Sequence, residues 1–240
     1  MPSPIDAALR RGRRAFYNIG GPWYRCRLFE ALGSKRFSHP ALFGMDSRLA
    51  ELMPWRGGTF VEAGAHDGYT QSNTYYLERH RGWSGLLVEP IPELNRRCTR
   101  RRANSRVLGV ALVGPGADQK KVTMDFGDLM STMEGHDHHA TGGLEVTGRR
   151  GYSVDVPART LSAALEEAGL AQVDLIVLDV EGHELDVLAG LDLERHAPRY
   201  LLVEMLDRTA QQPAIDAALA SHYEPVEMLS EYDVLYGRSG

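Results

Sequence analysis

The 240-residue chain has few of the features that cross-link a protein or anchor it in a membrane. Its two cysteines, Cys26 and Cys98, form no CxxC pair, so the sequence predicts neither a disulfide framework nor a structural zinc site. No apolar run is long enough to span a bilayer, and no apolar signal segment is evident. These absences favour a cytoplasmic chain that folds around its own hydrophobic core.

Several ligand-binding signatures are missing as well. The sequence has no GxGxxG pattern and no Walker A lysine, which disfavours dinucleotide and nucleoside triphosphate sites. From residue 56 onward, 28 Asp and Glu stand against 18 Lys and Arg. Such an acidic body argues against a nucleic-acid partner, because nucleic acids are bound on broad basic faces.

The amino-terminal part differs from the rest in charge and in pattern. Residues 1–55 carry nine Lys and Arg against four Asp and Glu, in short amphipathic pieces broken by proline and glycine. We interpret 1–55 as a helical cap segment. Residues 56–240 are expected to form one domain, since a chain of this length can bury a single sizeable core.

Beyond residue 56, apolar alternation predicts a regular succession of strands and helices. The expected strands are Thr59–Ala63, Gly85–Glu89, Val107–Val113, Lys120–Phe126, Tyr152–Val156, Val173–Val180, Tyr200–Glu204, Tyr223–Met228 and Tyr232–Tyr236. The expected helices are Gln71–His80, Glu93–Arg102, Thr160–Ala168, His183–Leu191 and Ile215–Ser221. Alternating strands and helices indicate βαβ units. The predicted fold class is therefore α/β: a Rossmann-like, doubly wound and mostly parallel sheet with a C-terminal antiparallel hairpin.

Two stretches depart from this pattern. Gly127–Gly151 is rich in glycine and polar residues, and a loop of this length is expected to close over bound ligands as a lid. Six arginines fall close together, and the usual meaning of such a run is a solvated helix face. They are Arg96, Arg97, Arg100, Arg101, Arg102 and Arg106.

Carboxylates and glycines gather where the predicted parallel strands end, the edge at which such sheets bind ligands. The strand-end segments are Glu62-Ala63-Gly64-Ala65-His66-Asp67-Gly68, Glu89-Pro90, Asp179 and Glu204. A phosphate site needs little negative charge, so acidic ends favour a ligand that carries positive charge and no phosphate. The sulfonium and α-ammonium groups of S-adenosylmethionine are such charges. Taken singly, Gly64 and Gly68 are also explained as turn glycines, and Glu89 as a helix cap.

Four blocks of the sequence resemble the FkbM-type methyltransferases: FVEAGAHDGYTQSNTYYLE, WSGLLVEPIPEL, VDLIVLDVEGHELDVLAGL and YLLVE. The resemblance implies a class I methyltransferase fold, S-adenosylmethionine as methyl donor and a hydroxyl acceptor. It places Glu62, Gly64, Asp67 and Gly68 at the methionine end, Ser72 and Asn73 near the carboxylate, Glu89 on the ribose, and Val110 and Ala111 beside the adenine. Ala65, Pro90 and Asp179 belong to the same strand-end segments and complete the predicted cofactor set.

A hydroxyl acceptor must lose its proton as it attacks, to a general base or with the help of a divalent cation. The candidate catalytic groups are Asp179, His183 and three histidines of the long loop, His136, His138 and His139. Asp179 and Glu204, at adjacent strand ends, are the candidate pair for Mg²⁺. Two structural alternatives stay open. In the first, the three loop histidines belong to a solvated polar loop. In the second, His183 and Glu184 form the start of a helix and have no catalytic role.

The sequence thus predicts an S-adenosylmethionine-dependent O-methyltransferase domain at 56–240 that acts on a small hydroxylated molecule, a saccharide or glycosylated metabolite. The alternatives are a nicotinamide-dependent oxidoreductase of similar fold and a non-catalytic binding module. The expected partner is the small-molecule acceptor, without nucleic acid and without membrane insertion. A homodimer is left open.

Overall fold

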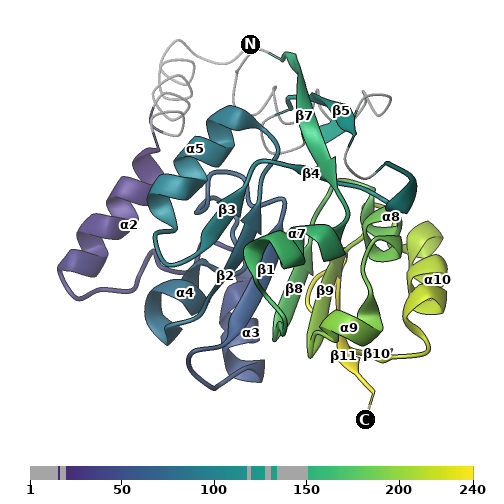
Figure 1. Cartoon of the computed structure of the whole chain (residues 1–240). Coiled ribbons are helices and arrows are strands. Elements are labelled where there is room, and N and C mark those ends of the chain that lie inside the picture. Colours follow the sequence, from purple (N-terminus) through teal and green to yellow (C-terminus); the bar gives the residue numbers. More distant parts are fainter. Residues whose placement is uncertain (1–15, 17–19, 118–119, 128–130, 134–150, 240) are drawn as a thin grey trace, which may run out of the picture.

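The computed structural model describes residues 16, 20–117, 120–127, 131–133 and 151–239, and strands alternate with helices along most of this length (Figure 1). The helices are α2 (Gly21–Ala31), α3 (Met45–Leu52), α4 (Tyr75–Arg81), α5 (Pro92–Arg101), α7 (Leu161–Ala168), α8 (Glu184–Ala189), α9 (Leu193–His196) and α10 (Arg208–Leu219), with 3-10 turns η1 (Leu42–Gly44) and η2 (Pro115–Ala117). The strands are β1 (Thr59–Ala63), β2 (Ser84–Val88), β3 (Arg106–Leu108), β4 (Ala111–Leu112), β5 (Lys121–Asp125), β6 (Thr132–Met133), β7 (Ser153–Arg159), β8 (Leu175–Leu178), β9 (Tyr200–Glu204), β10 (Tyr223–Met228) and β11 (Asp233–Arg238).

The central sheet has seven strands in the order β10-β11-β9-β8-β1-β2-β3. The five strands from β9 to β3 run parallel, whereas β11 lies antiparallel between β9 and β10. The strand order reverses at β1, which pairs with β2 on one side and with β8 on the other. The predicted doubly wound sheet with an antiparallel C-terminal hairpin is therefore confirmed.

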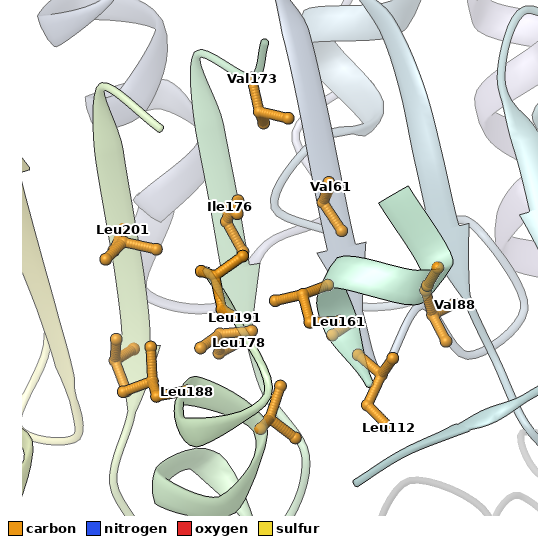
Figure 2. Packing of buried hydrophobic residues seen from close by; sticks show 14 of the residues in the cluster. Val61, Val88, Leu112, Leu161, Val173, Ile176, Leu178, Leu188, Leu191 and Leu201 are labelled. Carbon is orange, nitrogen blue, oxygen red and sulfur yellow. The ribbon is translucent and has the colours of Figure 1, made fainter. Parts of the chain in front are cut away.

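The alternation of apolar side chains along the parallel strands gives the sheet two buried faces. Val61, Val88 and Ile176 belong to an apolar cluster that also contains residues of α7, α8 and α10, and Figure 2 shows Val61 and Ile176 near Leu161 of α7. Their neighbours along the strands, such as Phe60 and Leu87, contact α3, α4 and α5 on the other face. A side-chain period of two delivers successive residues to opposite faces, so helices must cover both faces of this sheet.

The stretch 107–113, predicted as one strand, is two strands in different sheets. β3 ends at Leu108 and pairs with β2, while β4 begins at Ala111 and pairs with β7. β4 opens a smaller sheet of order β4-β7-β5-β6, which lies at the upper end of the molecule in Figure 1. The chain changes sheets at Gly109 and Val110. The prediction was wrong because alternation continues across this bend, and alternation does not report which partner a strand takes.

Two predicted helix starts were also wrong. The helix expected from Gln71 begins at Tyr75, because Ser72, Asn73 and Thr74 donate hydrogen bonds to Glu62 and are held in a loop. The helix expected from Ile215 begins at Arg208, where Asp207 caps it by accepting a hydrogen bond from the backbone nitrogen of Ala210.

Several expectations fall on segments that the structure does not describe. Of the predicted loop Gly127–Gly151, residues 128–130 and 134–150 lie outside the described residues, and with them the three loop histidines and the expected lid. Part of the predicted cap segment, 1–15 and 17–19, lies outside as well. Within the described remainder of 1–55, α3 and Met53 pack into the core below the sheet. The boundary at residue 55 stays a prediction.

No helix in the described ranges is both long enough and apolar enough to cross a membrane.

Gly64 directly follows β1, and its position leaves no room for a side chain. Its φ is +81°, and a β-carbon there would lie 1.9 Å from the backbone oxygen of Asp179. We expect Gly64→Ala to lower the free energy of unfolding by about 3 kcal/mol or more, from left-handed strain together with overpacking. Chemical denaturation measures this loss.

Gly57→Ala is the matched control for that substitution. Gly57 has a φ of +71° and no atom within 4 Å of its β-carbon position, so its replacement costs only the left-handed strain, about 1–2 kcal/mol. Equal losses in the two variants would contradict a steric role for Gly64.

Candidate active site

A pocket opens beyond the carboxyl ends of β1, β2, β3 and β8, the edge of a parallel sheet where ligands bind. Ten of the twelve residues predicted to contact the cofactor line it: Glu62, Gly64, Ala65, Ser72, Asn73, Glu89, Pro90, Val110, Ala111 and Asp179. His183 lines it too, whereas Asp67, Gly68 and Glu204 are not among the lining residues. The structure thus brings together segments that are more than 100 residues apart in sequence.

The loop after β1 is shaped by a buried ion-pair network around Arg102, which comes directly after α5 and is 1% exposed. Its guanidinium donates to Glu62 at 3.3 Å and to Glu78 at 2.9 Å. It also donates to Ser72 at 3.0 Å and to Thr74 at 2.8 Å. The carboxylate of Glu62 therefore holds the loop that follows it in place, although Glu62 also borders the pocket.

Asp67 and Gly68, predicted at the methionine end, contact α5 instead. Asp67 forms an ion pair of 2.5 Å with Arg101 and accepts hydrogen bonds from the backbone nitrogens of Tyr69 and Thr70. Burial by itself would raise the pKa of Asp67, but the hydrogen bond and charge of His66 and the charge of Arg101 lower it well below its usual range. A β-carbon on Gly68 would lie 2.9 Å from the Arg102 side chain.

The structure gives a steric reason for a glycine at position 64. Its β-carbon position is filled by the backbone oxygen of Asp179. The two strand ends that flank the pocket, those of β1 and β8, are thereby held in contact, and Asp179 is placed beside the loop after β1.

Glu89, predicted to hold the ribose, is 4% exposed and lines the pocket directly after β2. The backbone nitrogen of Ile91 donates to it at 2.8 Å. Burial raises the pKa of Glu89 to about 7, even though His66 opposes this shift. The carboxyl is thus poised to ionise when a hydrogen-bond donor arrives in the pocket.

Five acidic residues meet at the ends of β8 and β9 and beside them. Burial and the nearby charge and hydrogen bond of Glu204 raise the pKa of Asp179 well above its usual range. Burial and Glu204 likewise raise the pKa of Glu181 to about 8. Burial raises the pKa of Asp233 to about 6 and also raises that of Glu184. The predicted proximity of Asp179 and Glu204 is real, and the two carboxyls share a hydrogen bond.

Glu184 closes the turn that carries this acidic group. Its Oε1 accepts hydrogen bonds from the backbone nitrogens of Val180 at 3.2 Å and of Gly182 at 3.0 Å. Such bonds fix the loop between β8 and α8. The structural alternative for Glu184 thus has contacts that support it.

The remaining predicted catalytic and metal groups divide into two sets. His183 borders the pocket, with its Nδ1 3.9 Å from Asp186, while His136, His138 and His139 lie outside the described residues. In the part of the chain that the structure describes, no three His, Cys, Asp or Glu side chains are arranged to hold a metal ion.

Sequence reasoning missed several residues that build the site. Arg101 and Arg102 are buried ion-pair partners and not part of a solvated face, whereas Arg96 and Arg100 are exposed as expected. Glu181 lines the pocket, and the only signal for it was its position two residues after Asp179. Other lining residues are Thr70, Gln71, Leu112, Met124 and Ser131. Met124 and Ser131 come from the smaller sheet and the chain after it, so no local pattern could have found them.

The raised carboxyl pKa values predict an unusual dependence of stability on pH. A carboxyl with a raised pKa binds more protons folded than unfolded, so the free energy of unfolding falls as pH rises toward the folded pKa. With Glu89 near 7 and Glu181 near 8, we expect the melting temperature to fall between about pH 6.5 and 8.5, where Glu181 alone contributes on the order of 2 kcal/mol.

Burial and Glu204 raise the pKa of Asp179 as well, and this adds to the decline. The groups whose pKa values are lowered act outside this window. The protein loses stability in acid as Asp67 and Glu30, whose pKa values are lowered, become protonated. The pKa values of His80 and His196 are lowered too, so these residues affect the free energy of unfolding only below about pH 6.5. Glu181→Gln is the control, because it removes one titration and should flatten the decline. A wild-type melting temperature that is constant or rises across the window would contradict the assignment.

Comparison with known proteins shows which family the sequence matches. Residues 62–233 match the family described as Methyltransferase FkbM domain, while no curated protein matches the chain by sequence. The match begins near the end of β1 and includes β2, β3, β8 and β9, whose ends lie at or beside the pocket.

The fold is also similar to solved structures. A TehB-like SAM-dependent methyltransferase from Corynebacterium glutamicum is 13% identical over 95% of this chain and 100% of its own, with a TM-score of 0.45. A SAM-dependent methyltransferase from Aquifex aeolicus is 12% identical over 88% and 97%, with a TM-score of 0.45. Fibrillarin from Aeropyrum pernix is 12% identical over 82% and 76%, again with a TM-score of 0.45. Because the family match covers well over half of its residues, this chain belongs to the FkbM family of S-adenosylmethionine-dependent methyltransferases.

Proposed function

We propose that the chain is an O-methyltransferase that transfers a methyl group from S-adenosylmethionine to a hydroxyl of a small polar acceptor, a saccharide or a glycosylated metabolite. The observation that carries the proposal is the half-buried carboxyl pair of Asp179 and Glu204 at the ends of β8 and β9, hydrogen-bonded to each other and with the pKa of Asp179 raised. A carboxyl whose pKa lies near the working pH suits general base catalysis. Membership of a methyltransferase family displaces the nicotinamide-dependent alternative.

The pocket residues fit the cofactor on grounds of charge and of hydrogen bonding. Asn73 is 5% exposed, lines the pocket, and has no hydrogen-bond partner for its Oδ1 within the described residues. This oxygen is suited to accept a hydrogen bond from the α-ammonium group. Unpaired buried acids also favour a ligand that carries positive charge, since an opposite charge offsets their mutual repulsion.

The other end of the pocket suits a nucleoside. Glu89 is placed to accept hydrogen bonds from ribose hydroxyls, which favour its ionised form. Val110, Ala111 and Leu112 supply an apolar wall for the adenine ring. When bound, the cofactor supplies the methyl group, and its sulfur keeps the electron pair of the broken C–S bond.

Asp179 is the proposed general base, with Glu204 as its partner. Two carboxyls in contact repel each other when both are ionised, and this repulsion is one cause of the raised pKa of Asp179. A positive charge held beside Asp179 lowers its pKa, so that the carboxylate accepts the proton of the acceptor hydroxyl as the oxygen forms its bond to the methyl carbon. His183, at the same pocket, is the second candidate for this role.

The acceptor class is supported by the polar groups near the base. Thr70, Gln71, Ser131 and Glu181 line the pocket, and together they offer donors and acceptors for several hydroxyls. The acidic character of residues 56–240 favours an uncharged or cationic acceptor over a polyanion. A small hydroxylated molecule meets both conditions.

Substitution of the proposed base should separate chemistry from binding. We expect Asp179→Asn to lower kcat by about 10²–10⁴-fold, while the Kd for S-adenosylmethionine changes little. Release of S-adenosylhomocysteine with a panel of sugars measures the first, and calorimetry measures the second. Asp186→Asn, an exposed carboxyl on α8, is the control and should retain activity. A fully active Asp179→Asn enzyme would remove Asp179 from the role of base.

The same assay decides between the base and the Mg²⁺ predicted at Asp179 and Glu204. A carboxylate base with a neighbouring carboxyl needs no metal. Activity should therefore persist in excess EDTA, and the pH profile of activity should shift in the Glu204→Gln variant. Loss of activity in EDTA that Mg²⁺ or Mn²⁺ restores would instead assign the pair to a cation.

Glu89 gives a test of the cofactor orientation. Glu89→Gln should weaken S-adenosylmethionine binding by about 10- to 100-fold, the range for hydrogen bonds to a charged group, with no loss of melting temperature because a buried carboxyl is neutralised. Calorimetry and thermal melting measure the two effects, with exposed Glu51→Gln as the control. A lower melting temperature with unchanged affinity would make Glu89 a structural residue, and micromolar binding of NAD by the wild type would contradict the cofactor assignment.

A further inference from the structure

The described residues before β1 carry a concentration of exposed apolar side chains. Six of the eleven large apolar side chains exposed in the described part of the chain lie between residues 16 and 43. They are Phe16, Tyr24, Leu28, Leu32, Leu42 and Phe43. Single exposed apolar residues are ordinary, but a grouping of them marks an interaction site.

Three of these side chains form a stripe on α2. Tyr24, Leu28 and Leu32 recur every four residues, so they lie on one face of the helix and its C-terminal cap. They are 61%, 59% and 75% exposed. We refer to these three residues as the α2 stripe.

The inner side of α2 is firmly held, so the outward direction of the stripe is fixed. Cys26 is fully buried, and its Sγ lies 3.7 Å from the Tyr75 hydroxyl. Glu30 accepts hydrogen bonds from Arg79 at 2.9 Å and from Ser38 at 2.9 Å. These contacts join α2 to α4 and leave the α2 stripe exposed among the described residues.

The charge around the stripe has one sign. Residues 20–44 contain four basic residues and a single acid, Glu30. The side chain of Glu30 is only 3% exposed and is bound by Arg27 and Arg79. Arg25, Lys35 and Arg36 are exposed. The surface next to the α2 stripe therefore presents positive charge without an exposed acid in this stretch.

The neighbouring helix α5 adds to this charge. Arg101, at the end of α5, stacks on Trp23 of α2 with its guanidinium 5.3 Å from the ring, and the two helices lie side by side at the left of Figure 1. Arg96 and Arg100 of α5 are exposed. Both belong to α5, and they fit the solvated face expected for the 96–106 run.

We propose that the α2 stripe and its basic flank form a surface by which this protein binds peripherally to an anionic lipid membrane. Apolar side chains flanked by Arg and Lys are the combination that inserts into the acyl boundary while pairing with acidic headgroups. No membrane-spanning helix is needed for this mode of binding. It brings the protein to a surface without occupying the pocket.

The basic charge next to the α2 stripe favours an anionic membrane over a second copy of the chain or a nucleic acid. A second copy of the chain would bring Arg25 and Arg36 toward the same basic residues of its partner, which opposes an isologous dimer through this face. A nucleic acid would engage the arginines but would leave Leu28 and Leu32 exposed to water. An anionic bilayer satisfies both the charge and the apolar side chains.

Co-sedimentation of the full chain with vesicles tests the proposal. The protein should sediment with vesicles of phosphatidylcholine that contain phosphatidylglycerol, should not do so with phosphatidylcholine alone, and should be released by salt. Leu28→Glu combined with Leu32→Glu should weaken the binding at least about tenfold. Lys35→Glu combined with Arg36→Glu should weaken it by about fivefold per charge or more. Met228→Glu, at an exposed methionine on β10, is the matched control and should bind as the wild type does.

A labelled variant gives a direct readout of contact. Cys26 and Cys98 are fully buried, so Leu28→Cys offers one accessible thiol for a polarity-sensitive dye. Its emission should shift to the blue with anionic vesicles and not with neutral ones. This measurement decides the matter even where a charge-reversal variant fails to fold, as judged by its melting temperature.

Three results would overturn the proposal. The first is wild-type protein that ignores anionic vesicles. The second is a wild-type dimer in light scattering that Leu28→Glu dissociates, with no dye shift on vesicles, which would make the surface a contact between copies. The third is salt-sensitive binding to an oligonucleotide, lost in the Lys35→Glu and Arg36→Glu variant, without binding to vesicles.

Discussion

The buried guanidinium of Arg102 is the group on which the geometry of the pocket depends. It connects the end of α5 to Glu62 on β1, to Glu78 on α4, and to hydroxyls of the loop between them. A buried charge is tolerated only when its partners satisfy it, so the loop has one arrangement in which Arg102, Glu62 and the hydroxyls are all paired. Removal of one partner would leave the others charged and unpaired, a loss of about 3–5 kcal/mol. The position of Asn73 and the late start of α4 follow from this arrangement.

Across the pocket, on β8 and β9, the electrostatics are reversed. Asp179, Glu181 and Glu204 lie close together, no basic residue in the described part of the chain forms an ion pair with them, and the pKa values of Asp179 and Glu181 are raised. A fold gains no stability from keeping acids in this state. Such groups are expected where chemistry or a charged ligand requires them. The contrast separates the two sides of the pocket: on the Glu62 side the charges are paired and maintain the fold, and on the Asp179 side neighbouring acids raise the pKa values of Asp179 and Glu181.

The same separation applies to the arginines that follow one another in the chain. Arg101 and Arg102 are tied to Asp67, Glu62 and Glu78, whereas Arg96 and Arg100 face solvent next to α2. A helix turns by about 100° per residue, so adjacent residues of one charge run lie on different faces. The sequence predicted a solvated run because it contained no sign of where α5 would be covered. Only the packing of the loop after β1 against α5 distinguishes the two pairs.

What the sequence by itself determined is set by local periodicity. Alternating apolar residues specified the strands, carboxylates and glycines marked their ends, and the resulting order of elements predicted the doubly wound sheet. Together with the blocks that resemble the FkbM-type methyltransferases, the strand ends also predicted the family and twelve cofactor residues, of which ten line the pocket. What only the tertiary structure decided is which charges pair and which sheet a strand joins. Arg102 meets Glu62 across 40 positions, and β4 leaves β3 to pair with β7. The physical reason is that burial and partners arise from contacts between distant segments, and a local pattern carries no record of them.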